Sequence, residues 1–441
     1  MARIAPMSGF PEYLPAQRLV EQRVGDVLRE VFELHGFASI QTRAVETLEM
    51  LTRKGEITKE VYVVRRIHAA AGDTDVLGLH FDLTVPFARY VLENAGHLVF
   101  PFRRYQIQPA WRGERPQEGR YREFWQADID IVGQGELATH HDTEVVLVML
   151  EALARLHTEL GIPEVLLHVN NRKLAQGFYE GLGVADPLAV IQIVDKLDKV
   201  GPAVVGELLS AQGVPAAAVE RILELAAIRS ADDSFIAAVR ALGVDNALLE
   251  TGLQELATLL SALRARFPQQ VVADLKIARG LDYYTGNVFE IDLPSHPSLG
   301  TVSAGGRYDA LASDGKHTYP GVGISFGITR VLAPLLAKGV FTASRPVPSC
   351  VLVAVDSEET RSVADAVAAA LRARNIPCEV SPTAAAYGKQ IKVADRRGIP
   401  YVWFGGLQGS IKDIRSGAQW DADATCWFPP PADLKPTIMR G

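Results

Sequence analysis

The sequence is poor in cysteine and has no long run of apolar residues. Its 441 residues include three cysteines, Cys350, Cys378 and Cys426. An odd number of widely spaced cysteines excludes a disulfide scaffold and a four-cysteine zinc site, and it is typical of a reducing cytoplasm. A transmembrane helix needs about 18 consecutive apolar residues, and no such stretch is present, so we expect no membrane partner. Residues 1–10 lack the apolar segment of a signal peptide.

Several catalytic motifs are also absent. The sequence has no GxxxxGK[ST] phosphate loop, no GxGxxG after a strand and no HExxH metal motif. The glycines between Gly321 and Gly327 have the wrong spacing for a dinucleotide fingerprint. His140 and His141, beside Asp142 and Glu144, are metal-ligand types, but neighbouring residues on a helix face different ways. We therefore expect a solvent-exposed helix start there, and no metal site fixed by protein ligands alone.

Basic residues are outnumbered by acidic residues and are unevenly distributed along the chain. The chain has 45 basic and 52 acidic residues, a net charge of −7, which argues against a protein that coats nucleic acid through general basicity. Residues 202–270 are rich in alanine and leucine and contain five arginines against eight acidic residues. Residues 386–415 contain six basic residues against two acidic ones. The second segment is therefore a candidate surface for nucleic acid.

The hydrophobic pattern divides the chain into a part that mixes helices and strands, a helical part, and a part in which strands and helices alternate. It predicts a helix from about Leu19 to Leu34, a helix capped by Thr84, and a hairpin of residues 98–109 and 121–132 with a charged loop. The βαβαβ alternation after Cys350 predicts a separate α/β domain. Residues 1–171 and 271–340 are predicted to form one domain, into which residues 172–270 insert as a helical region. Residues 341–349 are predicted to be a linker, and residues 350–441 the last domain.

The loop of the predicted hairpin is dense in arginine. Arg112, near the end of one strand, and Arg120, at the start of the next, can converge from two sides and form a fork suited to a polyphosphate. Arg120 and Arg122 alternate along a strand and therefore project to opposite faces, so at most one of them enters a given site. An exposed hairpin laced with salt bridges is the alternative interpretation of the same charges.

Further segments combine glycine with aromatic or charged residues. In Arg279-Gly-Leu-Asp-Tyr-Tyr-Thr-Gly286, the glycines allow close approach to a ligand, and the tyrosines offer ring faces and hydroxyl groups. Gly305-Gly-Arg-Tyr-Asp309 precedes Gly321–Arg330, where glycines clear space at a junction of strand and helix. Arg330 lies where it can reach a bound anion. A turn with packing tyrosines and a tight strand–helix junction are the alternatives.

Together these segments resemble those of histidyl-tRNA synthetase, a class II aminoacyl-tRNA synthetase. Ser8–Pro15 and the helix after it resemble the family's opening and its motif 1, the dimer-forming element. Arg112–Asp130 resembles motif 2 in its histidine-specific form, and Gly321–Arg330 resembles motif 3. The two histidine-signature stretches are matched by Arg279–Gly286 and Gly305–Asp309, and the RGLDYY sequence in the first is highly specific.

The resemblance extends over about residues 8–417 and implies an α+β fold. The expected fold is a class II catalytic domain on a mostly antiparallel sheet flanked by helices, with a helical insertion and a C-terminal α/β anticodon-binding domain. The implied enzyme activates L-histidine with ATP to histidyl-adenylate and pyrophosphate, then transfers histidine to the 3′ end of histidine tRNA. Mg²⁺ should accompany ATP, bound mostly by phosphates and water. The resemblance also implies a cytoplasmic homodimer.

The resemblance implies a role for each matching residue. Arg112 and Arg120 resemble the arginines that hold the α- and γ-phosphates of ATP, and Glu114 resembles the residue that contacts adenine. Arg330 resembles the motif 3 arginine on the far side of the triphosphate. Arg279 resembles the catalytic arginine that bridges the histidine carboxylate and the α-phosphate. The residues that resemble the histidine site are Asp82 and Thr84 for the α-amino group, and Gln126, Asp130, Tyr283 and Tyr284 for the pocket.

The histidine pocket also has a chemical logic of its own. Imidazole presents a donor and an acceptor, so Asp130 can accept from one nitrogen while a tyrosine hydroxyl meets the other. A polar pocket of this kind rejects analogues that leave its groups unpaired, by about 10⁴–10⁵-fold. Many bacterial members carry Glu at the positions of Asp82 and Asp130. In contrast, Arg115-Pro-Gln117 resembles the bacterial loop that meets the tRNA acceptor end.

Two other functions share part of this pattern. A synthetase-like regulatory subunit of ATP phosphoribosyltransferase typically lacks the anticodon-binding domain and ATP-binding residues, both of which this sequence contains. A class II synthetase for another amino acid is disfavoured by RGLDYYTG. In the C-terminal domain, Tyr387 and Trp403 are candidates for stacking on anticodon bases, and a core position is the equal alternative for Trp403.

Overall fold

The computed structural model describes residues 5–52, 59–68, 76–277 and 283–441. They form two compact units, one comprising residues 25–334 with the N-terminal residues up to 11, the other comprising 12–24 with 335–441. Arg279, predicted to be catalytic, lies outside the described residues. Within the described ranges, no helix is both long and apolar enough to cross a membrane.

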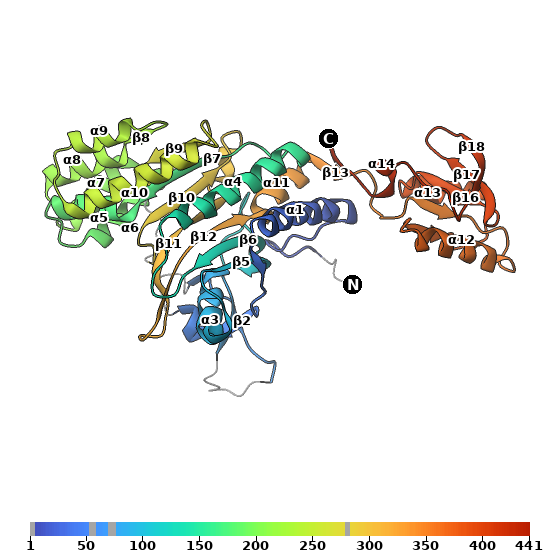
Figure 1. Cartoon of the computed structure of the whole chain (residues 1–441), viewed down its shortest axis with the longest axis horizontal. Helices are drawn as coiled ribbons and strands as arrows, with labels where there is room; N and C mark the ends of the chain where they lie inside the picture. The colour runs from blue at the N-terminus through green and yellow to red at the C-terminus, as the bar shows by residue number, and fades with distance from the viewer. Residues whose placement is uncertain (1–4, 53–58, 69–75, 278–282) are drawn as a thin grey trace. The chain divides into compact units, whose positions relative to one another are not determined.

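A nine-stranded sheet forms the centre of the first unit (Figure 1). The neighbours β1 and β5, and likewise β7 and β9, run parallel, whereas the other neighbouring pairs run antiparallel. The prediction of an α+β fold on a mostly antiparallel sheet is therefore confirmed. In spatial order the strands are β1 (Ala38–Ser39), β5 (Phe102–Trp111), β6 (Glu123–Val132), β12 (Thr318–Gly327), β11 (Ser303–Ser313), β10 (Asn287–Asp292), β7 (Leu166–Asn171), β9 (Val271–Asp274) and β8 (Arg229–Ser230).

The hairpin of β5 and β6 brings polar residues into the interior of this sheet. Arg104 lies opposite Asp130, and Gln106 lies opposite Asp128. All four side chains are buried. Because a buried polar group without a partner is costly, such a set must find partners on neighbouring elements or on a ligand. The hairpin therefore places buried charged side chains within the sheet.

An acidic side chain precedes helix α3 (Thr84–Asn94). The prediction that Thr84 caps this helix is wrong, because Thr84 is already its first residue. Instead the carboxylate of Asp82 accepts a hydrogen bond from the backbone N–H of Val85 at 3.1 Å. The first amides of a helix have no partner within the helix, so a short acidic side chain before it satisfies one of them. This contact fixes the position of Asp82.

Two further helices cover the sheet of the first unit, α4 (His140–Leu160) and the start of α11 (Ile328–Ala337). Along α4 the buried residues Val145, Met149 and Leu156 recur at helical spacing and form its apolar face. The helix ends at Gly161, whose φ of 76° is the left-handed conformation that glycine adopts without strain.

The predicted insertion is helical and lies at the β7 and β9 end of the sheet (Figure 1). Two of its helices cross very closely, because Gly177 on one and Gly252 on the other have no side chain. A Cβ atom at Gly177 would lie 2.2 Å from the backbone nitrogen of Leu249, and one at Gly252 would lie 2.2 Å from that of Leu174. The helices are α5 (Arg172–Gly181), α6 (Pro187–Val194), α7 (Leu197–Ala211), α8 (Ala216–Ala226), α9 (Ser234–Ala241) and α10 (Ala247–Arg264).

Smaller elements complete the N-terminal part of the chain. The predicted first helix is α1 (Pro15–Leu34), with Val27, Leu28 and Val31 buried. A separate three-stranded sheet has the order β2-β4-β3. Its strands and the helix beside it are β2 (Val45–Thr47), β3 (Val63–Val64), β4 (Leu77–Leu79) and α2 (Leu48–Thr52).

The second unit contains the predicted α/β alternation. Its five-stranded sheet has the order β15-β14-β16-β17-β18, in which β14 runs parallel to both of its neighbours. Trp403 on β16 is fully buried in the core, which confirms the core alternative for this residue. The sequence pattern missed the antiparallel strands at one edge of the sheet. The elements are β14 (Val351–Val353), α12 (Arg361–Ala373), β15 (Cys378–Val380), α13 (Tyr387–Arg396), β16 (Tyr401–Phe404), β17 (Gln408–Asp413) and β18 (Gln419–Asp423).

The proline-rich end of the chain is ordered by contacts within the same unit. After a short helix, α14 (Pro431–Leu434), strand β19 (Ile438–Arg440) pairs antiparallel with β13 (Phe341–Ala343). Strand β13 begins the segment that the sequence pattern predicts as a linker. The two segments therefore satisfy each other's backbone groups.

Candidate active site

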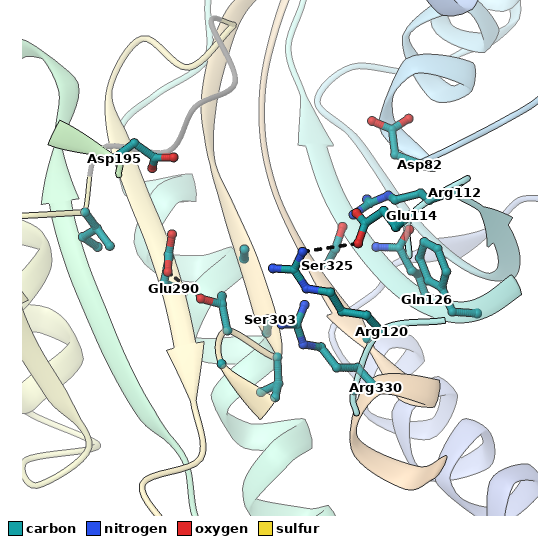
Figure 2. Close-up of a pocket in the computed structure, with 18 of the residues that line it drawn as sticks. Asp82, Arg112, Glu114, Arg120, Gln126, Asp195, Glu290, Ser303, Ser325 and Arg330 are labelled. Atoms are coloured by element: carbon teal, nitrogen blue, oxygen red, sulfur yellow. Dashed lines mark hydrogen bonds and ion pairs between the residues drawn. The ribbon is translucent and has the colours of Figure 1, made fainter. Parts of the chain in front are cut away.

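A cavity of about 680 Å³ lies in the first unit, and most of the predicted site residues line it (Figure 2). Its wall draws on the start of α3, the loop between β5 and β6, the strands β6, β10, β11 and β12, and the start of α11. The predicted site residues in the lining are Asp82, Thr84, Arg112, Glu114, Arg120, Gln126, Tyr283, Tyr284 and Arg330. Of the remaining predicted residues, Asp130 lines a smaller cavity that shares Thr84 and Tyr284, whereas Arg115 and Gln117 are exposed outside both.

Three arginines approach this cavity, and backbone or side-chain oxygens hold them in place (Figure 2). The Nε of Arg112 donates to the carbonyl of Phe81 at 2.9 Å, and the Nε of Arg330 donates to the carbonyl of Leu299 at 2.8 Å. The Nη1 of Arg120 lies 3.4 Å from Glu114 Oε2. Fixed guanidinium groups at one cavity can bind several oxygens of an anion such as a polyphosphate.

Arg122 lies outside the cavity, as predicted, but neither Arg120 nor Arg122 belongs to a named strand, because β6 begins at Glu123. Its Nε donates to the carbonyl of Glu114 at 3.2 Å, and its side chain packs on Gly9. A Cβ atom at Gly9 would lie 2.9 Å from Cγ of Arg122. Arg120 and Arg122 are therefore neighbours in sequence with separate environments, one at the cavity and one in the supporting structure.

A carboxylate, that of Asp130, lines the smaller cavity. Asp130 is buried, and its two oxygens have different partners. The hydroxyl of Tyr308 donates to Oδ1 at 2.6 Å, and the guanidinium Nη2 of Arg104 lies 2.6 Å from Oδ2. The sequence pattern missed Tyr308 and Arg104 as site residues. Tyr308 lies inside the GGRYD motif, and the alternation of β5 puts Arg104 on the same face as Gln106, so both signals were present.

The glycines of the segment Gly321–Arg330 make room for this group. A Cβ atom at Gly323 would lie 2.0 Å from Asp130 Oδ1, and one at Gly321 would lie 2.4 Å from the ring of Tyr308. The sequence predicts cleared space here, and the space is filled by protein side chains. Each glycine permits an acidic or aromatic group to lie flat against β12.

Burial changes the acidity of the carboxyl groups around this cavity. Burial raises the pKa of Asp130 to about 6, although Arg104 and Tyr308 act to lower it. Burial also raises the pKa of Asp128 to about 7, where Arg104 lowers it and the charge of Asp130 raises it further. The pKa of Asp82 is raised by burial as well, against the hydrogen bond from Val85. Three acidic groups thus share the field of one buried arginine.

Two lining atoms are buried and have no hydrogen-bond partner among the described residues. They are Oε1 of Gln126 and Oγ of Ser303. A native structure rarely leaves such atoms unsatisfied, so they indicate a polar ligand in the cavity. Gln126 is one of the residues that the sequence analysis places in this site.

The insertion contributes to the opposite wall of the cavity, which the sequence analysis did not predict. Asp195 and Asp198, at the junction of α6 and α7, line it together with Lys276 and Glu290 (Figure 2). Lys276 Nζ lies 2.9 Å from Asp198 Oδ1. The cavity therefore has an arginine-rich side and an opposite side on which acidic residues alternate with Lys199 and Lys276. No sequence motif marks the α6–α7 junction, because its role depends on how the insertion packs.

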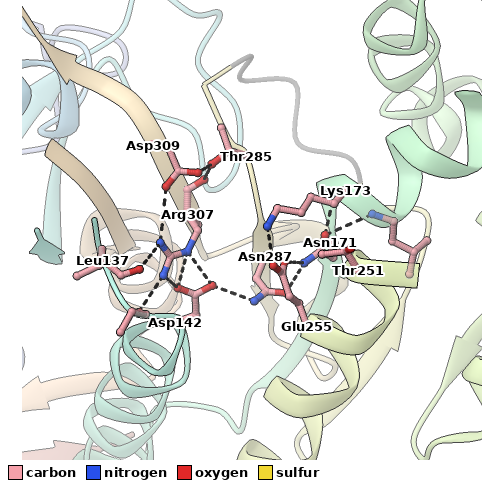
Figure 3. Close-up of polar contacts among 12 residues, drawn as sticks. Leu137, Asp142, Asn171, Lys173, Thr251, Glu255, Thr285, Asn287, Arg307 and Asp309 are labelled. Carbon is pink, nitrogen blue, oxygen red and sulfur yellow. Dashed lines mark hydrogen bonds and ion pairs between the residues drawn. The ribbon is translucent and has the colours of Figure 1, made fainter. Parts of the chain in front are cut away.

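A buried polar network lies beside the cavity and includes Arg307 of the segment Gly305–Asp309 (Figure 3). Arg307 binds Asp142 through an ion pair of 2.7 Å and donates to the carbonyls of Leu137 and Ala138 at 3.0 Å. The amide of Asn287 donates to Asp142 at 2.9 Å. The network continues through hydrogen bonds of Asn171, the N-cap of α5, to Asn287 and to Glu255 on α10.

The prediction of a solvent-exposed start for α4 is wrong for part of this turn, because His141 and Asp142 are buried. The ligand atoms of His140, His141 and Glu144 lie within 4.8 Å of one another. However, Glu144 also forms an ion pair with Arg103. A carboxylate that an arginine already neutralises is a poor ligand for a cation, so the group supports no metal assignment.

The basic segment of the second unit is less charged in space than in sequence. Arg415 lies between Asp413 and Asp433, at 3.1 and 2.7 Å, and Arg397 lies 3.1 Å from Glu379. Both cations are therefore neutralised by neighbours. The basic residues that remain exposed on α13 are Lys389, Lys392 and Arg396.

Comparisons with known proteins agree with the resemblance. The chain matches the family model described as histidyl-tRNA synthetase over residues 9–331 and that described as anticodon binding domain over 349–408. It is 62% identical to the histidine–tRNA ligase of Cutibacterium acnes, covering 100% of this chain and 99% of that protein. The crystal structure of histidyl-tRNA synthetase from Nostoc sp. PCC 7120 superposes with a TM-score of 0.82 at 31% identity, covering 96% and 98% of the two chains. A Bacillus halodurans structure described as an ATP phosphoribosyltransferase regulatory subunit/histidyl-tRNA synthetase shares the fold, with a TM-score of 0.71 at 20% identity over 88% and 96%.

Proposed function

The chain belongs to the histidyl-tRNA synthetase family, and from this membership we propose that it is a histidine–tRNA ligase. The enzyme activates L-histidine with ATP to histidyl-adenylate and pyrophosphate, then transfers histidine to the 3′ end of histidine tRNA. The observation that carries the proposal is the meeting of two subsites in adjoining cavities that share Thr84 and Tyr284. An arginine-lined region suited to a triphosphate adjoins a small pocket lined by the paired carboxylate of Asp130.

The first subsite binds ATP in this proposal. Arg112 holds the α-phosphate, Arg120 the γ-phosphate and Arg330 the far side of the triphosphate, while Glu114 contacts adenine. Positive charge fixed before the reaction stabilises the negative charge that develops as the histidine carboxylate attacks the α-phosphorus and pyrophosphate leaves. Arg279 completes this group and bridges the two reactants.

The second subsite binds histidine. Asp82 and Thr84 hold the α-amino group, and the Oε1 of Gln126, which lacks a partner among the described residues, is a further acceptor for it. The carboxylate of Asp130 accepts from the imidazole N–H, and a tyrosine hydroxyl from Tyr283 or Tyr284 meets the other nitrogen. An amino acid without these groups would leave buried polar atoms unpaired.

Magnesium, tRNA contacts and assembly belong to the same proposal. Glu290 lines the cavity and offers the carboxylate oxygens that Mg²⁺ prefers, so the lining fits an ion held mainly by the phosphates and water. When bound, the ion neutralises charge on the phosphates. Arg115 and Gln117 meet the tRNA acceptor end, and residues 350–441 bind the anticodon. The enzyme works as a cytoplasmic homodimer, with residues 1–171 and 271–340 as the catalytic domain and 172–270 inserted.

ATP–pyrophosphate exchange with each amino acid in turn tests the proposed reaction. We expect exchange with histidine alone, because only imidazole satisfies the pocket.

A matched pair of variants tests the first subsite. Arg120→Ala should raise the KM for ATP by about 10–100-fold, as loss of a charge-assisted contact predicts. Arg122→Ala, which removes a neighbouring arginine outside the cavity, should leave that KM within about twofold. Exchange that is absent with histidine, or equally fast with another amino acid, would refute the function.

A regulatory subunit of ATP phosphoribosyltransferase is the second candidate function. The match to an anticodon binding domain over residues 349–408 argues against it. So does the presence of Arg112, Arg120 and Arg330 at one cavity. The exchange assay separates the two, because a regulator would bind histidine without forming the adenylate.

A further inference from the structure

Arg104 is a fully buried arginine beneath the histidine pocket, with 0% of its surface exposed. It lies on β5 directly opposite Asp130 on β6, and its Nη2 lies 2.6 Å from Asp130 Oδ2. Its guanidinium carbon also lies 4.2 Å from the centre of the Phe87 ring, which covers its other side. Arg104 lines neither cavity, so it can act on a bound substrate only through its neighbours.

Arg104 has few hydrogen-bond partners within the protein. Its Nη1 has a long contact of 3.4 Å to Oε1 of Gln106. Its Nε and its Nη2 have no partner in hydrogen-bond geometry among the described residues, so the contact of Nη2 with Asp130 is an ion pair. Burying a guanidinium with so few partners is unfavourable, and a position that served packing alone would be filled better by an apolar side chain. The arginine therefore has a purpose beyond packing.

That purpose concerns the state of the Asp130 carboxylate. The charged and titratable groups that face Asp130 are Asp128 on its own strand, Tyr308 on β11, Asp82 before α3 and Arg104 on β5. Arg104 is the cation among them, and it lowers the pKa of Asp130 against the effects of burial and of Asp82. Without it, a carboxyl group so deeply buried would keep its proton at neutral pH.

We propose that Arg104 is a positioning residue for histidine recognition, which holds the Asp130 carboxylate ionised and oriented toward the imidazole. The proposal rests on the proposed function, because it names how the histidine pocket of that enzyme is kept competent. The charge of Arg104 lies beside Oδ2 while the Tyr308 hydroxyl donates to Oδ1, and each carboxylate oxygen keeps lone-pair capacity for an imidazole N–H. A protonated or rotated Asp130 would offer the imidazole N–H no acceptor.

The test compares Arg104→Met with Arg103→Met in ATP–pyrophosphate exchange. Arg103 is the neighbour on the same strand, and its ion pair with Glu144 lies away from the pocket. We expect Arg104→Met to raise the KM for histidine at pH 7 by at least about tenfold, because a pKa one unit above the assay pH leaves about a tenth of the carboxyl ionised. The KM for ATP should stay within about twofold. Arg103→Met should change neither KM.

The pH dependence separates positioning from a purely structural role. In Arg104→Met the KM for histidine should fall as the pH rises from 7 toward 9, because Asp130 then ionises without the arginine. Arg104→Lys, which keeps a cation at the site, should restore much of the affinity at pH 7. A folded Arg104→Met with the histidine KM and pH profile of the wild type would overturn the proposal. Failure of both Arg104 variants to fold, while Arg103→Met folds, would overturn it as well.

The two levels of inference fail in different ways. If the wild-type enzyme shows no histidine-dependent exchange, the proposed function fails. If the wild type is active and Arg104→Met keeps its histidine KM, the function stands and the role of Arg104 falls.

Discussion

Two buried arginines in the same sheet have opposite surroundings. Arg307 on β11 donates from Nε to Asp142 at 3.0 Å and from both terminal nitrogens to backbone carbonyls at 3.0 Å (Figure 3). Arg104 on β5 has one close ionic partner, Asp130, and its Nε lacks a hydrogen-bond partner among the described residues. Both are nearly or fully buried. The difference therefore lies in how completely each charge is satisfied by the protein itself.

This difference separates a cluster that holds the fold from one that holds a substrate site. Every hydrogen-bonding direction of Arg307 is used within the protein, so the cluster is complete without a ligand. Around Arg104 the acidic groups Asp128 and Asp130 compete for one cation, and Oδ1 of Asp128 has no partner among the described residues. A site that must accept a polar substrate keeps part of its hydrogen-bonding capacity open, and this lowers its contribution to stability.

The largest expected effect follows removal of Arg307, the arginine whose hydrogen-bonding groups are used within the protein. Arg307→Met leaves Asp142 buried without its cation, which should lower the free energy of unfolding by about 3–5 kcal/mol. Urea unfolding followed by tryptophan fluorescence measures this loss. The protein that remains folded should keep the wild-type KM for histidine, because Arg307 lines neither cavity.

Arg103→Met is the control for this prediction. Its partly exposed ion pair with Glu144 should contribute less than about 1 kcal/mol. A loss below that level in Arg307→Met, together with a changed histidine KM, would reverse the comparison and make Arg307 the arginine that acts on the substrate.

The sequence indicates the residues of the Arg307 cluster more clearly than those of the Arg104 cluster. Arg307 belongs to the GGRYD signature, and Asp142 marks a helix start, yet their pairing across 165 positions depends on how α4 packs on β11. Arg104 lies in no quoted motif, and its partner Asp130 is recognised only as a pocket residue. Strand periodicity and motifs predict which elements exist. They do not predict which buried side chains meet, because a register such as Arg104 opposite Asp130 is fixed only once the hairpin pairs.

The second-largest expected effect tests whether the cluster of Arg104, Asp128 and Asp130 lowers the stability of the fold. Burial raises the pKa of Asp128 to about 7, far above its value of about 4 in an unfolded chain. The folded state therefore binds the proton more tightly, and stability falls as the pH rises from about 4 to about 7. Asp128→Asn removes this ionisation. Relative to the variant, the wild type should lose about 2–4 kcal/mol over that range, measured by urea unfolding at each pH. Parallel curves for the two proteins would contradict the idea that the cluster is strained by excess carboxylate.

The smallest effect concerns a third buried cation, His168 on β7, whose two ring nitrogens lie 2.8 Å from Asp274 and 3.2 Å from Asp292. Burial alone would lower the pKa of His168, but its hydrogen bonds to these carboxylates outweigh burial and raise the pKa to about 9. Because the folded pKa exceeds the unfolded value of about 6.5, the stabilisation is complete below pH 6.5 and is lost as the pH rises through 9. The wild type should therefore lose up to about 3 kcal/mol between these limits, whereas His168→Gln should show a flatter profile. Since both nitrogens of His168 are paired, this cation resembles Arg307, and the variant should keep the wild-type KM for histidine. A raised KM for histidine in His168→Gln would show that a buried cation can act on the substrate even when its donors are paired with carboxylates.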